Sequence, residues 1–235
     1  MTTETKIFYD KTAHLYDERY NNPTAKYMRS YEEKIIKKYS GGRTIDIGCG
    51  TGQHLTLLND VVGFDISSKM LEEADKKSEA PLVQGKAEQI PFKNNSFDTV
   101  ICMFTVLNLA EYEIAVKEMN RILKLGGVAI ASVVSRWKEQ SSLLENLSKE
   151  REEKITTVRI EGFRLRSNVI TRKRFIHLFK SNGFDVIKNI DLFKWQKPYW
   201  GWKREFTKIE KLKLKIDRLL PAKTARLHMA VFKKI

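Results

Sequence analysis

Three glycines, Gly48, Gly50 and Gly52, alternate with small residues directly after an apolar, strand-like run that ends at Ile47. A glycine turn after a strand lets a ligand approach the backbone where a Cβ atom would clash. Asp65 follows a short helical pattern and a second apolar run. A carboxylate at that place can accept hydrogen bonds from both hydroxyl groups of a ribose. Together these residues predict a pocket for a cofactor that contains a nucleoside.

The carboxylate of Asp46 narrows the choice of cofactor. A dinucleotide-binding turn spaces its glycines as G-x-G-x-x-G and seats a pyrophosphate on a helix N-terminus. Here the spacing is G-x-G-x-G, and Asp46 stands just before it. A carboxylate would repel a pyrophosphate but attract an ammonium or a sulfonium group. The turn therefore favours S-adenosylmethionine over a dinucleotide.

The segments around the turn alternate between strand-like and helical patterns. Two helices are expected first, over residues 4–18 and 24–39. The chain then reads, in order, as strand 44–47, helix 53–58, strand 61–64, helix 67–74, strand 81–83, strand 97–104, helix 112–123 and strand 128–134. Repeated βα units with nearly continuous apolar strands predict a parallel sheet that is covered on both faces.

The sequence after residue 134 is less regular. Residues 137–170 are polar and charged, and no element is expected there. A helix over 171–181, a strand over 184–193 and a final strand over 227–232 follow, and a basic, aromatic insertion occupies 195–221. We therefore expect an elaboration of the α/β core rather than a second domain.

Length and composition fit one domain. The chain has 235 residues, of which 42% are hydrophobic, enough for a substantial core. The expected parts are a helical cap, a cofactor-binding core and a substrate-side elaboration with the last strands, over residues 1–40, 41–134 and 135–235. No apolar run approaches the roughly 20 residues of a membrane span, and the N-terminus lacks the apolar core of a signal peptide. No transmembrane segment is therefore expected.

The two cysteines, Cys49 and Cys102, are too few for a disulfide framework. Neither they nor the four scattered histidines form a recognisable metal-ligand cluster, so no metal is expected. This cysteine usage predicts a protein of the reducing cytoplasm.

The net charge of +14 is unevenly distributed along the chain. Residues 1–150 carry a net charge of −1, and residues 151–235 carry +15. The basic part is therefore an addition to an electrically ordinary core. Such a surface either binds an anionic partner, such as nucleic acid, a membrane surface or an acidic substrate, or is simply solvated.

Five ordered segments carry a family resemblance: the glycine turn at 44–52, and then 62–67, 85–92, 95–100 and 121–127. In this order they resemble the motifs of class I S-adenosylmethionine-dependent methyltransferases, in the broad group that includes quinone-biosynthesis and tRNA wobble-uridine methyltransferases. The resemblance is continuous over about residues 5–134 and fainter over the last strands. It implies an α/β, Rossmann-like, doubly wound sheet of seven strands, mostly parallel, with an antiparallel last strand.

The resemblance also implies a set of residues that bind S-adenosylmethionine. Tyr9 and Tyr16 would close over the cofactor from the N-terminal helix, although the same residues could pack on the sheet. Ala87 and Glu88 would meet the edge of the adenine. The full set is Tyr9, Tyr16, Asp46, Gly48, Gly50, Gly52, Asp65, Ile66, Ala87, Glu88, Met103 and Phe104.

Methyl transfer itself requires little from the protein. The nucleophile must be held at roughly 3 Å from the methyl carbon, and a general base is required only if it arrives protonated. The candidate polar groups near the mouth are Asn108, Tyr112, His54, Trp137 and Tyr199. Residues 102–108 lack the Asn/Asp-Pro-Pro-Tyr motif of many base and glutamine-amide methyltransferases, which disfavours methylation of an exocyclic amine by that mechanism.

The insertion begins with three tryptophans and one tyrosine within residues 195–202. The helix expected after it has one apolar stripe, formed by Trp202, Phe206, Ile209, Leu212, Ile216, Leu219 and Leu220. Lysines and arginines occupy its other faces. Three interpretations remain open: a lid packed on the sheet edge, a helix that binds anionic lipid, and a surface for RNA.

We therefore predict methyl transfer from S-adenosylmethionine to a small or amphipathic acceptor. The alternative enzyme is a tRNA methyltransferase that binds RNA through its basic C-terminal third. A non-catalytic binding module is a further alternative, which the intact glycine turn and Asp65 disfavour.

Overall fold

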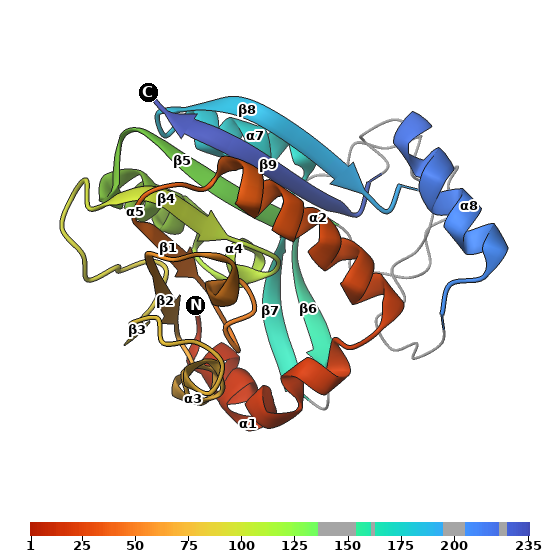
Figure 1. Ribbon diagram of the computed structural model, residues 1–235, viewed down its shortest axis with the longest axis horizontal. Helices are drawn as coiled ribbons and strands as arrows, with labels where there is room; N and C mark the ends of the chain where they lie inside the picture. The colour runs from red at the N-terminus through yellow and green to blue at the C-terminus, as the bar shows by residue number, and fades with distance from the viewer. Residues whose placement is uncertain (136–153, 161–162, 195–204, 221–224) are drawn as a thin grey trace.

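Seven strands form one sheet in the order β3-β2-β1-β4-β5-β9-β8. The computed structural model describes residues 1–135, 154–160, 163–194, 205–220 and 225–235 (Figure 1). The strands are β1 (Thr44–Ile47), β2 (Val61–Asp65), β3 (Leu82–Gln84), β4 (Phe97–Cys102), β5 (Leu123–Val134), β8 (Phe184–Leu192) and β9 (Leu227–Lys234). Strands β1 to β5 pair in parallel, and β9 lies antiparallel between β5 and β8. This arrangement confirms the predicted doubly wound sheet with an antiparallel last strand.

The order of the strands places a crevice at the centre of the sheet. From β1 the chain moves outward through β2 and β3 on one side, and then returns to build β4 and β5 on the other. The connections that leave the carboxyl ends of β1 and β4 therefore diverge. In open α/β sheets, ligands bind at this switch point.

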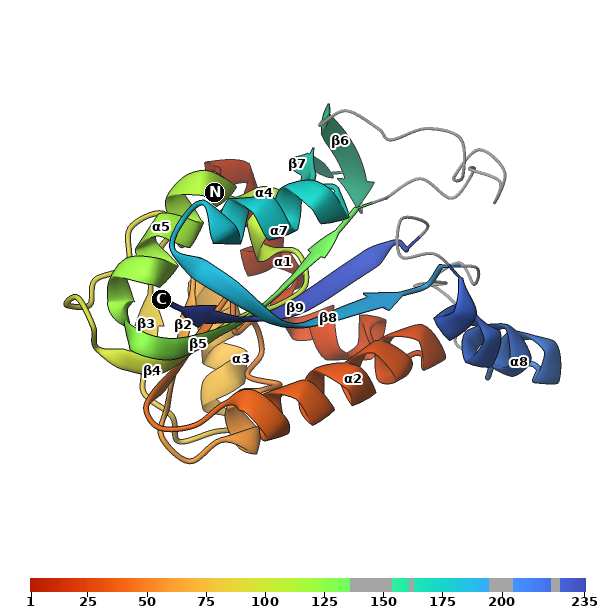
Figure 2. The same cartoon turned by 90° about the horizontal axis from the view of Figure 1, so that it is seen from above.

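Helices cover both faces of the sheet, α2 (Pro23–Tyr39) and α3 (Ser68–Asp75) on one and α5 (Tyr112–Ile122) and α7 (Arg172–Lys180) on the other (Figure 2). Helix α2 begins where the sequence requires, because the Asn22 side chain accepts a hydrogen bond from the Ala25 amide and Pro23 follows it. Between the sheet and α7 the rings of Phe179 and Phe232 stack with centroids 3.9 Å apart.

A hairpin of β6 (Lys154–Ile160) and β7 (Phe163–Val169) forms a second, two-stranded sheet where no element was expected. The prediction of irregular structure there was wrong because its two-residue alternation is partly hidden by charge. Leu165 and Ser167 of β7 are buried, whereas Arg164 and Arg166 are exposed. Leu165 packs with the ring of Phe8, so the hairpin supports α1 (Thr3–Arg19) from outside the main sheet.

Three smaller predictions are also corrected. The helix expected over 53–58 is a single 3-10 turn, η1 (Leu55–Leu57). Strand β4 ends at Cys102, and the short helix α4 (Val106–Leu109) follows it closely. Strand β5 begins at Leu123 rather than 128, because Gly126 and Gly127 continue the strand instead of ending a turn.

Within the basic insertion, the structure describes helix α8 (Lys208–Ile216) and the 3-10 turn η2 (Asp217–Leu219). The predicted stripe does not stay on one buried face: Ile209 and Leu212 are exposed, and Leu214 supplies the buried contact. Trp137, Tyr199 and the tryptophans of 195–202 lie outside the described residues. Within the described part of the chain, every helix is too short or too polar to span a bilayer.

Candidate cofactor-binding cleft

A cleft opens at the carboxyl ends of β1, β2 and β4, and the empty space in and directly before it amounts to about 970 Å³. We call one part the glycine end, formed by Gly48, Gly50, Asp65, Ile66 and Ala87. The other part, the helix end, is formed by Tyr20, Met28, Arg29, Glu32 and Phe104. The first set comes from turns that follow strands, and most of the second comes from α1 and α2.

The glycine turn lies with its backbone against the cleft. Gly48 has a φ of 76°, and an added Cβ atom would lie 2.2 Å from Cγ2 of Val106. Gly50 has a φ of 53°, but no atom lies within 4 Å of its Cβ position. The first glycine thus admits α4, and the second leaves space beside the turn that a ligand can fill. Gly52 does not line the cleft, because it packs against Ala74 of α3.

Asp65, at the end of β2, joins the turns on both sides of the cleft. Its Oδ2 accepts a hydrogen bond from the Gly50 amide at 2.9 Å, and its Oδ1 accepts one from the Ser67 amide at 2.9 Å. Burial raises the pKa of Asp65 to about 6, although the Ser67 and Gly50 amides act in the opposite direction. Each carboxylate oxygen keeps a second lone pair for a ligand hydroxyl.

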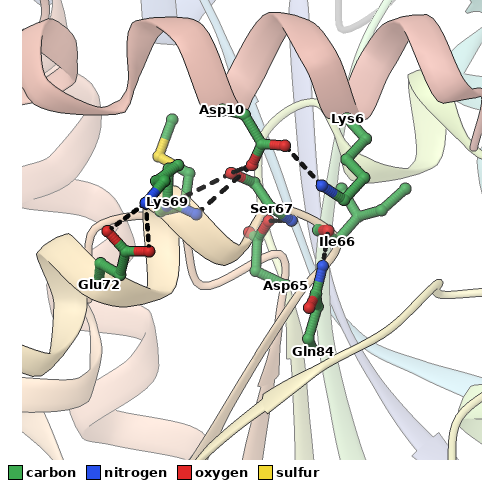
Figure 3. A network of polar contacts seen from close by, with 9 residues as sticks. Lys6, Asp10, Asp65, Ile66, Ser67, Lys69, Glu72 and Gln84 are labelled. Atoms are coloured by element: carbon green, nitrogen blue, oxygen red, sulfur yellow. Dashed lines mark hydrogen bonds and ion pairs between the residues drawn. The ribbon is translucent and has the colours of Figure 1, made fainter.

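Helix α1 is fastened to α3 through Asp10 (Figure 3). The Asp10 carboxylate accepts hydrogen bonds from the Ser67 hydroxyl at 2.6 Å and from Lys6 at 2.5 Å. Ser67 also caps α3, because its side chain accepts a hydrogen bond from the Met70 amide. One contact therefore connects the helix over the cleft to the turn that contains Asp65.

A second fastening lies nearer the end of α1. The Thr51 hydroxyl donates to Asp17 at 2.7 Å, and Lys77 forms an ion pair with the same carboxylate. Lys77 also donates to the Thr51 carbonyl at 3.0 Å. With Asp10, these contacts hold α1 beside both the glycine turn and the start of α3.

Tyr9, Tyr16 and Tyr20 present a row of rings from α1 to the cleft, with centroid separations of 6.3 and 4.7 Å. The Tyr9 hydroxyl is 3.2 Å from that of Thr105. Burial raises the pKa of all three phenols above the usual value of a tyrosine, most strongly for Tyr9 and Tyr16. The tyrosines therefore stay neutral and serve as hydrogen-bonding and apolar surface rather than as bases.

His54 lies between two buried carboxylates. Its Nδ1 is 3.3 Å from Oδ2 of Asp46, and its Nε2 is 3.4 Å from Oε2 of Glu32. Burial alone would lower the pKa of His54, but Asp46 and then Glu32 raise it to about 10. The side chain is therefore an imidazolium at neutral pH. His54 and Glu32 line the cleft, whereas Asp46, which was predicted to bind the cofactor, lies beneath His54 and is not among the lining residues.

Helix α2 contributes two charged groups that sequence reasoning missed. Arg29 lines the cleft, and its guanidinium has neither a hydrogen bond nor an ion pair among the residues that the structure describes. Glu32 is 3% exposed, and its Oε1 has no hydrogen-bond partner in the same set. The spacing of three residues puts both groups on one helix face, but no signal in the sequence says that this face meets the cleft.

Phe104 turns into the cleft just after β4. Its φ is 63°, and its amide donates to the Ser132 hydroxyl at 2.5 Å. A bulky residue in the left-handed region is strained, and such strain is concentrated at functional sites. Met103 precedes it and also lines the cleft, so both of these residues, predicted to bind the cofactor, are at its wall.

Comparisons with known proteins indicate the kind of domain that contains this cleft. Residues 45–131 match a family model described as a methyltransferase domain. An uncharacterized protein of Methanocaldococcus jannaschii is 38% identical over 196 residues, which cover 77% of this chain and 76% of that protein. The chain belongs to the class I S-adenosylmethionine-dependent methyltransferases.

Two further relatives show how much of this methyltransferase is similar in sequence and how much is similar in fold. The demethylmenaquinone methyltransferase of Staphylococcus carnosus is 33% identical over 135 residues, which cover 52% of this chain and 56% of that enzyme. A solved S-adenosylmethionine-dependent methyltransferase of Thermotoga maritima shares the fold, with a TM-score of 0.65, 21% identity and coverage of 97% and 98% of the two chains.

The residues of the methyltransferase fit the cofactor of its family. The open space beside Gly50 and the lone pairs of Asp65 suit an adenosine, and Ile66 and Ala87 add apolar contact in the same part of the cleft. Tyr9 and Tyr16 lie in the cleft where α1 covers it. The part of the methyltransferase that the structure describes contains no cluster of metal-ligating side chains.

Three other predicted residues do not line the cleft. The Glu88 carboxylate pairs with the amino group of Met1 and accepts a hydrogen bond from the Glu111 amide at 2.9 Å. Asn108 is fully buried, and its amide joins the backbones of Val134 and Asn168. Tyr112 packs on the core beneath the guanidinium of Arg174. Glu88, Asn108 and Tyr112 therefore hold the walls of the methyltransferase together.

Proposed function

We propose that this methyltransferase methylates a small or amphipathic acceptor that binds at the helix end of the cleft. The observation that carries the proposal is the division of one cleft into two chemically different parts. The glycine end offers backbone and one carboxylate, whereas the helix end combines apolar surface with charge. A bound S-adenosylmethionine supplies an activated methyl group on a sulfonium.

At the glycine end, Asp65 would accept hydrogen bonds from the ribose hydroxyls, and the turn at Gly50 would adjoin the cofactor. Helix α1 would cover the cofactor through Tyr9 and Tyr16, since Asp10 and Asp17 fasten that helix over the cleft. Excluding water and fixing the cofactor are the main contributions that an in-line transfer requires from the protein.

At the helix end, Met28, Tyr20 and Phe104 offer an apolar wall to the body of the acceptor. Arg29 would attract an acidic or polarised group, because no carboxylate of the described residues is paired with it. The free Oε1 of Glu32 would accept the proton of a nucleophile that arrives protonated. We therefore infer an acceptor with an apolar body and an ionisable oxygen or nitrogen as the nucleophile.

The relatives support this acceptor class without fixing it. The Staphylococcus carnosus enzyme is named for demethylmenaquinone, but the shared region covers only 52% of the present chain. Residues 151–235, with their net charge of +15, favour a second candidate, a tRNA methyltransferase. The two candidates differ in the fraction of the cell that receives the methyl group.

A labelling experiment separates them. Extract from the source cells is incubated with the enzyme and methyl-labelled S-adenosylmethionine, and label is then counted in lipid, small-molecule, RNA and protein fractions. We expect label in the lipid or small-molecule fraction, and less of it with the Glu32→Gln variant. Label confined to RNA would replace the proposal with the tRNA candidate. Calorimetry with the cofactor alone checks that the enzyme preparation binds it.

A further inference from the structure

The outward side of α8 combines exposed aliphatic side chains with lysines. Nine large apolar side chains are exposed among the described residues, and three of them fall within residues 209–219. Ile209 is 67% exposed, Leu212 is 55% exposed and Leu219, in η2, is 83% exposed. Helix α8 also contains four lysines and one glutamate. Exposed apolar side chains that gather on one element, rather than lying singly, indicate an interaction surface.

These side chains are ordered around the helix. Ile209, Leu212 and Ile216 follow one another at intervals of three and four, so they share one face. Lys208, Lys211 and Lys215 repeat the same intervals one position earlier, and they form an exposed row along the edge of that face. None of these three lysines has an ion pair with any residue that the structure describes. An apolar face bordered by unpaired lysines is the pattern of helices that lie in a membrane interface.

The opposite side of α8 fixes the helix to the body of the enzyme. Leu214 is buried and belongs to the same apolar cluster as Met28, and Phe206 and Phe104 pack against that cluster. Met28 and Phe104 also line the helix end of the cleft. Figures 1 and 2 both place α8 at the periphery of the molecule, beyond the end of β8. The outward face of α8 therefore points away from the enzyme. Its buried face packs on the cluster that adjoins the helix end of the cleft.

We propose that the outward face of α8 binds an anionic lipid surface. The occupant follows from the two kinds of side chain together. Lysines complement phosphate groups on lipid and RNA alike, but Ile209 and Leu212 gain free energy only if the partner also offers an apolar interior. Single-stranded RNA rewards stacking on aromatic rings and arginines, and aliphatic side chains cannot provide this.

Binding in this orientation would bring the helix end of the cleft, where the acceptor is proposed to bind, close to the membrane. An acceptor with an apolar body could then pass from lipid to the wall formed by Met28 and Phe104 without crossing water. The proposal concerns the location of the enzyme and goes beyond the methyl transfer itself. Its test uses neither cofactor nor turnover, so it can fail while the proposed function stands.

The experiment measures flotation of the full chain with vesicles, either phosphatidylcholine alone or an equal mixture with phosphatidylglycerol. We expect the wild-type protein to float with the mixed vesicles only. The variant Ile209→Ser/Leu212→Ser should bind them about tenfold more weakly, because two aliphatic contacts are lost. The variant Lys208→Glu/Lys211→Glu/Lys215→Glu should lose about fivefold for each lysine.

The matched control reverses three exposed lysines on α5 and α7 (Lys117→Glu/Lys173→Glu/Lys180→Glu) and has the same net charge as the α8 variant. We expect it to float like the wild type, and thermal melting checks that every variant is folded. The proposal is overturned if the control loses binding equally, or if the serine variant floats unchanged. It is also overturned if wild type fails to float but binds total tRNA through the three lysines of α8.

Discussion

The two ends of the cleft are built by different means. At the glycine end, Gly48 and Gly50 use backbone geometry, and Asp65 joins that turn to the next within a short stretch of chain. At the helix end, Arg29 and Glu32 come from α2, and Phe104 comes from the end of β4. The first end depends on turns that a few neighbouring residues determine. The second depends on how helices pack on the sheet.

Because of this difference, the two ends of the cleft should tolerate amino-acid substitutions to different degrees. A glycine with positive φ and a buried acid bonded to two amides admit few replacements. Side chains on a helix face can be exchanged while the helix stays in place. We therefore expect the glycine end to hold the cofactor shared by the family, and the helix end to select the acceptor.

The largest expected effect tests the glycine end directly. Asp65→Ala removes the acceptor of two ribose hydrogen bonds and should weaken cofactor binding by about 3 kcal/mol, or roughly a hundredfold. Stability should also fall, because the Gly50 and Ser67 amides lose their partner. Calorimetry with S-adenosylmethionine measures the affinity, and Asp60→Ala, an exposed acid before β2, is the control. An unchanged affinity would remove the ribose assignment.

At the boundary of the two ends, His54→Gln should cost about 3 kcal/mol of stability, because Asp46 and Glu32 would remain buried without a cation. The pKa of His54 is raised from 6.5 to about 10 by folding, so its contribution is complete below pH 6.5 and is lost as pH rises through about 10. The difference between wild type and variant should therefore shrink with rising pH.

Urea denaturation at several pH values measures this difference. His177→Gln, on the exposed face of α7, is the control and should change the stability little. A difference that stays constant from neutral pH to above pH 10 would show that His54 contributes packing rather than charge.

The contrast between the ends also explains what the sequence could predict. The succession of strands and helices along the chain and the residues Gly48, Gly50 and Asp65 were predictable because each depends on a local pattern of turn and strand. The β6–β7 hairpin and the 3-10 turn η1 were not, because the hairpin packs on α4 and α1 and the turn packs on α2, and no local pattern specifies these contacts.

Side-chain destinations were harder to predict than elements. Asp46 was expected in the cleft, but η1 and its preceding turn bring His54 over it. Asn108 has the polarity of a catalytic residue, but it is buried and joins the backbones of β5 and β7. Arg29 and Glu32 belong to a helix whose position on the sheet no local motif specifies. A polar residue near a motif can therefore hold the wall of the cleft in place rather than bind the ligand.

A change of pH gives a smaller effect that is specific to the glycine end. Burial raises the pKa of Asp65 to about 6, and a protonated carboxyl group is a poorer acceptor for ribose hydroxyls. Cofactor affinity should therefore fall as pH drops through about 6, by up to tenfold for each further pH unit. Calorimetry between neutral pH and about pH 5 follows this change. The Asp65→Asn variant should bind more weakly at neutral pH and show little of this dependence, whereas an equal dependence would assign it to another group.

The smallest effect tests whether α1 belongs functionally to the glycine end or to the helix end. Asp10→Asn weakens the contact with Ser67 by about 1 kcal/mol, which leaves the turn of Asp65 intact but loosens the cover. A helix that covers a bound cofactor lowers its dissociation rate more than it changes its association rate. With the cover loosened, we therefore expect the cofactor to dissociate about fivefold faster with little change in its association rate. Stopped-flow measurement of tyrosine fluorescence resolves the two rates, and His14→Gln on the exposed face of α1 is the control. If both rates are unchanged, α1 shapes the entrance for the acceptor and the cofactor depends on the strand turns alone.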